Sequence, residues 1–195
     1  IILLSNLNTK ETLELEIICI INPFKKVIVN DILGPVDVNS GYTKYNGYVR
    51  KIVIWRYEEI LKVLIHELIH ALNIDTFKNN LMLSSKLTKL FNVNKPVRII
   101  ESFTESAATI LNLLINMIVL NIPIKLFKEL LEYERQFILH QVAKILNHYN
   151  IYNFNDLIHN KKMFKEETNI CMYYIVKSIL LYDIEKYLDL CCNKI

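Results

Sequence analysis

The sequence predicts an α+β fold in one domain, because two different residue patterns follow one another along its 195 residues. Short runs rich in Ile and Val, together with all three glycines, lie in the strand-rich part, residues 1–57. In the helical part, residues 58–195, apolar side chains recur at helical spacing, and no linker, repeat or low-complexity tract separates the parts. With 52% hydrophobic residues the chain can bury one sizeable core.

Three β-prone runs predict a small N-terminal sheet. They cover Thr12–Ile21, Lys25–Asn30 and Tyr48–Trp55, and the first and third partly alternate between apolar and polar residues, as half-buried strands do. The turn signals "NPF" and "YNGY" punctuate these runs. We expect the sheet to be antiparallel and to lead into the helical body.

Helical periodicity begins at Glu58 and runs to Asn73, with acidic residues in its first turn, where the helix dipole favours them. The next predicted helix opens near Asn94 or Pro96 and continues to Leu120. Further helices are expected at about 125–149, 153–161 and 166–190.

Composition argues against several kinds of partner. The net charge is +3, the lysines are scattered, and no basic run is interleaved with aromatic residues, so we expect no nucleic-acid partner. The chain has no N-x-S/T acceptor, and none of its four cysteines shows C-x-x-C spacing; the cysteines are Cys19, Cys171, Cys191 and Cys192. Both features favour a reducing, intracellular (cytoplasmic) compartment.

One stretch, residues 107–124, is borderline for a membrane span. It carries no charged side chain, but it contains Asn112, Asn116 and Asn121 and has Pro123 near its end. Because a span needs roughly 20 apolar residues, we expect a buried core helix and no membrane partner.

The run "VLIHELIHAL", Val63 to Leu72, places a polar triplet in an apolar helix. His66 and His70 are four residues apart and therefore lie on one helical face, where both imidazoles can bind one zinc ion. Glu67 lies beside His66 and can reach a water molecule activated by that metal, the chemistry of the H-E-x-x-H arrangement. Burying the triplet without a ligand would be costly, which favours a metal site.

A catalytic zinc site needs a third protein ligand. The extended motif H-E-x-x-H-x-x-G-x-x-H does not fit, because Asn73 and Thr76 occupy its Gly and His positions and Asp75 is one step out of register. A glutamate from the next helix is the alternative. Glu101 and Glu105 are four residues apart on one face, so one can bind zinc while the other accepts a hydrogen bond from an imidazole.

The stretch "IIESFTESAA" resembles the E-x-x-[AST]-[DE] motif of the gluzincin metallopeptidases, and the apolar flanks of the first motif match the broader zincin pattern. The resemblance implies a zincin-like fold in which Glu101 binds Zn²⁺, Thr104 is a small packing residue and Glu105 supports the first histidine. Glu105 as the zinc ligand, read as E-x-x-A with Ala108, stays open. In this family an edge strand before the active-site helix pairs with extended substrate, which would be the strand at Val49–Trp55.

We therefore expect a zinc-dependent peptide-bond hydrolase that acts on a peptide or protein, with Glu67 as general base. The alternatives are a catalytically silent zincin-fold binding or scaffold module and a membrane-associated helical protein. Such a hydrolase usually adds a Tyr, His or Arg that stabilises the oxyanion. The sequence does not single one out among His140, His148, His159, Tyr133, Arg135, Tyr149, Tyr173 and Tyr174.

Overall fold

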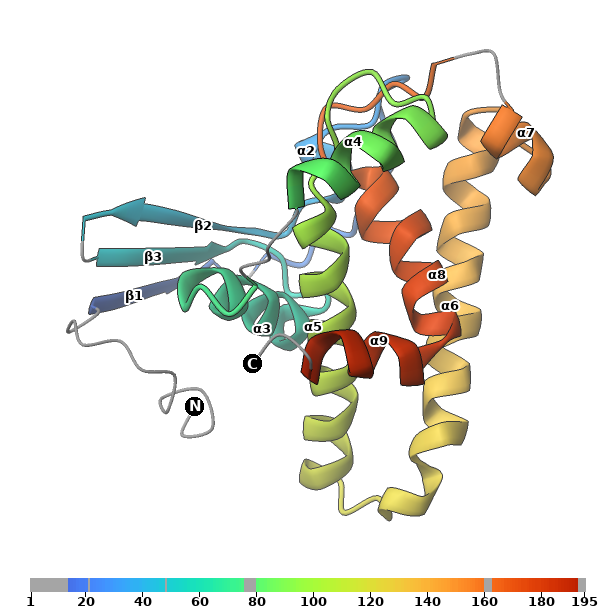
Figure 1. Cartoon of the computed structure of the whole chain (residues 1–195). Helices are drawn as coiled ribbons and strands as arrows, with labels where there is room; N and C mark the ends of the chain where they lie inside the picture. Colours follow the sequence, from blue (N-terminus) through green and yellow to red (C-terminus); the bar gives the residue numbers. More distant parts are fainter. Residues whose placement is uncertain (1–13, 21, 48, 76–79, 160–162, 193–195) are drawn as a thin grey trace.

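The fold of this chain, seen in a computed structural model, is a small sheet packed beside a helical body (Figure 1). The structure describes residues 14–20, 22–47, 49–75, 80–159 and 163–192. Predicted strand or motif residues at positions 12, 13, 21, 48 and 76 lie outside these ranges. The α+β class is confirmed.

The sheet has three strands in the order β1-β3-β2, where β1 is Glu14–Cys19, β2 is Gly41–Asn46 and β3 is Val49–Ile54. Strand β2 pairs with β3 in antiparallel fashion, but β1 pairs with β3 in parallel, from Glu14 opposite Val49 to Cys19 opposite Ile54. The sheet is therefore mixed: the expectation of antiparallel pairing is confirmed for β2 with β3 and wrong for β1. The long connection between β1 and β3, which includes β2, is what allows the parallel pairing.

The predicted strand at Lys25–Asn30 is not a strand. Its backbone binds a side chain instead, because the Val29 and Asn30 amides donate to the Asp37 carboxylate at 3.0 and 3.4 Å. Asp37 also accepts a hydrogen bond from the Gly34 amide and is only 1% exposed. Burial opposes its ionisation, but these hydrogen bonds together lower the pKa of Asp37.

The helical body contains one helix that the sequence analysis missed, α4, and a break where it expected a single helix at 166–190. The described elements are α2 (Pro35–Val38), α3 (Ile60–Ala71), α4 (Asn80–Leu90), α5 (Ile99–Val119), η1 (Ile124–Leu126), α6 (Phe127–His148), α7 (Phe154–His159), the π-helix η2 (Cys171–Val176), α8 (Lys177–Tyr182) and α9 (Ile184–Cys192).

Asparagine rather than glycine turns the chain at the ends of four helices. Each is the second residue after its helix, with φ between 47° and 56°: Asn73 after α3, Asn92 after α4, Asn121 after α5 and Asn150 after α6. This left-handed conformation is the usual helix C-terminal turn, which asparagine tolerates better than other residues with a side chain. These turns fit a chain with only three glycines.

Helix α3 is buried on two sides, between the sheet and α5 (Figure 1). Val63 and Ala71 pack against Ile52 and Ile54 of β3. Ile65 and Ile69 form a separate cluster with Ala108 of α5. A larger core joins α5 to α6, η2 and α8 on the other side. The polar triplet of α3 therefore lies at the junction of sheet and helical body.

Helix α5 is long and apolar enough to cross a membrane by length and composition, and 44% of its most apolar window is buried in the protein. Its buried residues include polar side chains in the first turns, among them Glu101, Ser102 and Thr104.

Candidate metal centre

The polar triplet lies where α3 is enclosed. His66 and Glu67 are 8% and 6% exposed, and His70 is half-buried. The helix contains neither glycine nor proline, so its periodicity holds the two imidazoles one turn apart. Ile65 and Ile69 face α5 while Val63 faces the sheet, and this packing fixes the rotation of the helix.

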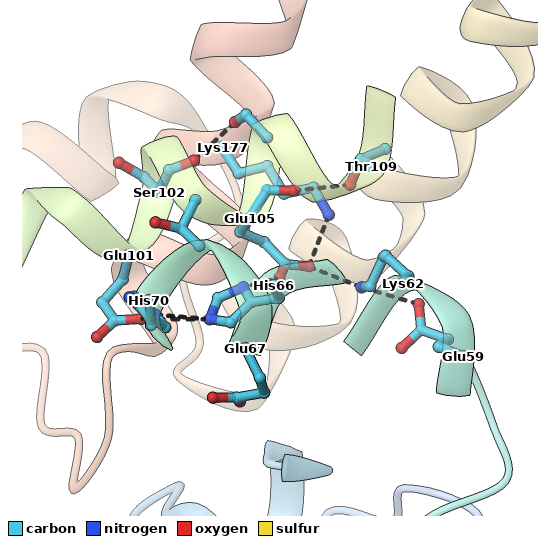
Figure 2. Close-up of polar contacts among 12 residues, drawn as sticks. Glu59, Lys62, His66, Glu67, His70, Glu101, Ser102, Glu105, Thr109 and Lys177 are labelled. Carbon is cyan, nitrogen blue, oxygen red and sulfur yellow. Dashed lines mark hydrogen bonds and ion pairs between the residues drawn. The ribbon is translucent and has the colours of Figure 1, made fainter. Parts of the chain in front are cut away.

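Three ligand-type atoms converge at this point (Figure 2). His66 Nε2 and His70 Nε2 are 3.0 Å apart, and Glu101 Oε2 lies 3.6 Å from the first and 3.3 Å from the second. Donor atoms around a tetrahedral zinc ion, at Zn–N distances of about 2.0–2.1 Å, are separated by about 3.3 Å. Within the described ranges, His66, His70 and Glu101 thus form a group that could hold a metal ion.

Glu105 lies on the opposite edge of the His66 ring. Its Oε2 is 2.9 Å from His66 Nδ1. Its Oε1 accepts hydrogen bonds from Lys62 Nζ at 2.6 Å and from Lys177 Nζ at 3.0 Å. Both carboxylate oxygens are therefore engaged away from the converging Nε2 atoms. An Nδ1–H that donates to Glu105 leaves the Nε2 lone pair of His66 free for a ligand. This geometry favours Glu101 over Glu105 as the third donor.

His70 has an equivalent partner in Asp75. The Nδ1 atom of His70 is 2.5 Å from Asp75 Oδ2, and Thr104 Oγ1 of α5 donates to the same oxygen at 3.2 Å. The turn at Asn73, with φ of 53°, reverses the chain after α3 and brings Asp75 beside His70. From the sequence, Asp75 was expected only as a ligand out of register. The signal available there was an acid five residues after the second histidine, beyond a helix-ending asparagine.

The carboxylates of Glu101, Glu105 and Asp75 surround the two imidazoles and create a site for positive charge. Burial alone would lower the pKa of His66, but hydrogen bonds with Glu101 and Glu105 raise it to about 9. Burial likewise opposes the charged form of His70, and Asp75 and Glu101 raise its pKa to about 10. The pKa of Glu101 falls despite burial because it faces both imidazoles. A metal cation would supply positive charge where these groups favour it.

Glu67 points from α3 towards the sheet and is not one of the three converging donors (Figure 2). Its Oε2 accepts the Thr43 hydroxyl of β2 at 2.7 Å. Burial raises its pKa, although nearby His66 and the Thr43 hydrogen bond oppose the shift. Strand β2 comes this close because of Gly41, where a Cβ atom would lie 2.8 Å from Val63 Cγ1 and 3.3 Å from Glu67 Oε1.

A pocket of about 450 Å³, a volume that includes its open mouth, adjoins His66 and Glu67. Of the candidates for oxyanion stabilisation, Tyr173 and Tyr174 line this pocket, and the others do not. Both tyrosines belong to the π-helix η2, a wide turn often found at functional sites. The Tyr173 ring centroid is 6.2 Å from that of His66. Burial, followed by Glu101 and Glu105, raises the pKa of Tyr173, so its phenol keeps its proton.

Comparison of this chain with protein-family models, with curated proteins and with solved structures finds no match.

Proposed function

We propose that this protein is a zinc-dependent peptide-bond hydrolase with a zincin-like fold and a gluzincin-type centre. The observation that carries the proposal is the convergence of His66 Nε2, His70 Nε2 and Glu101 Oε2, together with a carboxylate on each Nδ1 atom. Two imidazoles and one carboxylate, each imidazole fixed by a second carboxylate, form a donor set suited to catalytic zinc. Such a set leaves a fourth position for water.

Each residue around the centre has a role in this proposal. His66, His70 and Glu101 hold the metal, while Glu105 and Asp75 fix the tautomer and orientation of the two rings. Bound Zn²⁺ would lower the pKa of a water molecule to about 7 and polarise the substrate carbonyl. Glu67 would accept a proton from the attacking water and later donate it to the departing amine. Its buried position raises its pKa towards the range that suits a general base.

The strand that would align the substrate is β2 rather than the predicted Val49–Trp55. In the described sheet β3 is central, because it pairs with β1 on one side and with β2 on the other. Strand β2 is an edge of that sheet and touches α3 through the Thr43–Glu67 hydrogen bond (Figure 1). An extended peptide added along β2 would bring a backbone carbonyl close to Glu67.

Tyr173 is the residue proposed to stabilise the oxyanion that forms during attack. It lines the same pocket as His66 and Glu67, and its protonated phenol is a hydrogen-bond donor. A donor of this kind stabilises the negative charge that develops on the carbonyl oxygen.

The experiment compares zinc content and peptide cleavage in the parent protein, in Glu67→Gln and in Glu129→Gln. Glu129 is an exposed glutamate of α6 and serves as the matched control. We expect all three proteins to retain zinc. Glu67→Gln should cleave the peptide about 10²–10⁴-fold more slowly, which is the usual rate contribution of a general base. Equal cleavage by the parent and Glu67→Gln would refute the role of Glu67. A parent that binds zinc but cleaves nothing would favour the scaffold alternative.

A further inference from the structure

The pocket beside His66 is lined by two lysines whose hydrogen-bonding capacity is only partly used. Lys26 and Lys62 line it, together with Ser40 from the segment that joins α2 to β2. Each lysine ammonium has three donors. Lys26 Nζ contacts Glu59 at 2.8 Å, and Lys62 Nζ contacts Glu59 at 3.0 Å and Glu105 at 2.6 Å. Three of these six ammonium hydrogens therefore have no acceptor among the described residues.

The carboxylates next to these lysines are already occupied. Glu105 contacts His66, Lys62 and Lys177 (Figure 2). Glu59 forms ion pairs with both Lys26 and Lys62. Desolvation opposes the charge on Glu59, yet the two lysines lower its pKa to about 2. These acids stay ionised and bound to their cations. The two lysines therefore keep ammonium hydrogens that can bind a ligand.

Ser40 gives independent support for a ligand. The residue is only 4% exposed, and its Oγ atom has no hydrogen-bond partner among the residues that the structure describes. A buried hydroxyl without a partner destabilises the fold, so such groups usually have an explanation. Since Ser40 lines the same pocket as Lys26 and Lys62, one acceptor group placed there would satisfy all three.

We propose that this pocket is a specificity subsite that binds a carboxylate of the peptide substrate, held by Lys26, Lys62 and the Ser40 hydroxyl. The subsite shares His66 and Glu67 with the metal centre, so the carboxylate belongs to a residue that flanks the cleaved bond. The side chain of Asp or Glu supplies that group, as does the free C-terminus of a short peptide. This inference rests on the proposed hydrolase function.

Lys26 is the residue to change, because Lys62 also holds Glu105 and so touches the metal centre indirectly. Lys26→Gln removes one ammonium group and breaks a partly exposed ion pair with Glu59, whose loss has little effect on stability. Lys25→Gln is the matched control, since Lys25 is exposed and does not line the pocket. Ser40→Ala tests the hydroxyl separately.

The first measurement is the cleavage of a peptide library by the parent protein, read by mass spectrometry. We expect Asp and Glu to be enriched at one position next to the cleaved bond. Lys26→Gln should lower kcat/KM for an acidic peptide by about tenfold or more, the worth of a hydrogen bond to a charged group, and leave the matching Gln peptide unchanged. Lys25→Gln should change neither value. Peptides with free and amidated C-termini separate the two sources of the carboxylate.

A second measurement avoids turnover. Glu67→Gln, which should keep zinc without cleaving, is titrated calorimetrically with the acidic peptide and its amide counterpart, with and without Lys26→Gln. Tighter binding of the acidic peptide that depends on Lys26 supports the subsite. Cleavage with no preference for Asp, Glu or a free C-terminus, or an equal effect of Lys26→Gln on acidic and neutral peptides, would overturn it and leave the hydrolase function intact. Absence of both zinc and cleavage would refute the hydrolase function itself.

Discussion

Removal of Asp75 tests whether the carboxylates on the two Nδ1 atoms serve metal binding. The Asp75 carboxylate lies 2.5 Å from His70 Nδ1 and is itself held by Thr104. Asp75→Ala leaves that ring without its partner, so the ring can rotate and can carry its proton on Nε2, the atom that faces the metal position. Loss of such a partner weakens metal binding by about 10–100-fold, or about 1.4–2.8 kcal/mol.

The assay is zinc competition against a chromophoric chelator at constant pH. We expect Asp75→Ala to raise the zinc Kd by that factor, and Asp75→Asn, which keeps an oxygen acceptor without the charge, to raise it less. Asp156→Ala on α7 is the matched control, because Asp156 is exposed and contacts Asn153. Circular dichroism verifies that each variant is folded. A zinc Kd within twofold of the parent for folded Asp75→Ala would refute the positioning role of Asp75.

Three other substitutions test polar groups of the helical body. Glu105→Ala leaves the buried ammonium groups of Lys62 and Lys177 without their shared carboxylate. We expect urea unfolding to show that the free energy of unfolding falls by about 3–5 kcal/mol, and an unchanged midpoint would contradict this pairing. Burial raises the pKa of Glu166 from 4.5 to about 7 in the folded protein. Because the unfolded chain ionises at lower pH, the free energy of unfolding falls by up to about 3 kcal/mol as pH rises from about 4.5 to 7. Glu166→Gln should remove this fall, so that its stability exceeds that of the parent at pH 8 and approaches it at pH 4.5; parallel pH profiles for the two proteins would contradict it. Tyr173→Phe should lower kcat by about 10²–10³-fold with little change in KM or zinc content, and an unchanged kcat would exclude its role at the oxyanion.

Features that depend on local periodicity were predictable from the sequence. The spacing of His66 and His70 on a helix, and of Glu101 and Glu105 on the next, follows from 3.6 residues per turn and needs no tertiary information. The fold class was predictable for the same reason, since strand-like and helix-like runs occupy different parts of the chain. The prediction that Glu101 is the third donor used the family motif, and its Oε2 atom does face both imidazoles.

Features that depend on the path of the chain rather than on periodicity were not predictable in this way. In the β-prone run at Lys25–Asn30, the Val29 and Asn30 amides donate to the Asp37 carboxylate, a contact that the alternation of residue types does not predict. Strand β2 has the sequence "GYTKYN", whose glycine and asparagine indicate a turn, and it becomes a strand because it pairs with β3. The parallel pairing of β1 and the turn that brings Asp75 to His70 depend on the path of the chain.

The most direct measurement of the central claim is a crystal structure of the zinc-loaded protein, with anomalous diffraction recorded at the zinc edge. The account predicts one anomalous peak per chain, at about 2.0–2.2 Å from His66 Nε2, His70 Nε2 and a Glu101 carboxylate oxygen. It also predicts that Glu105 remains on His66 Nδ1. A peak bound by Glu105 instead of Glu101, or no peak between the two imidazoles in protein saturated with zinc, would contradict it.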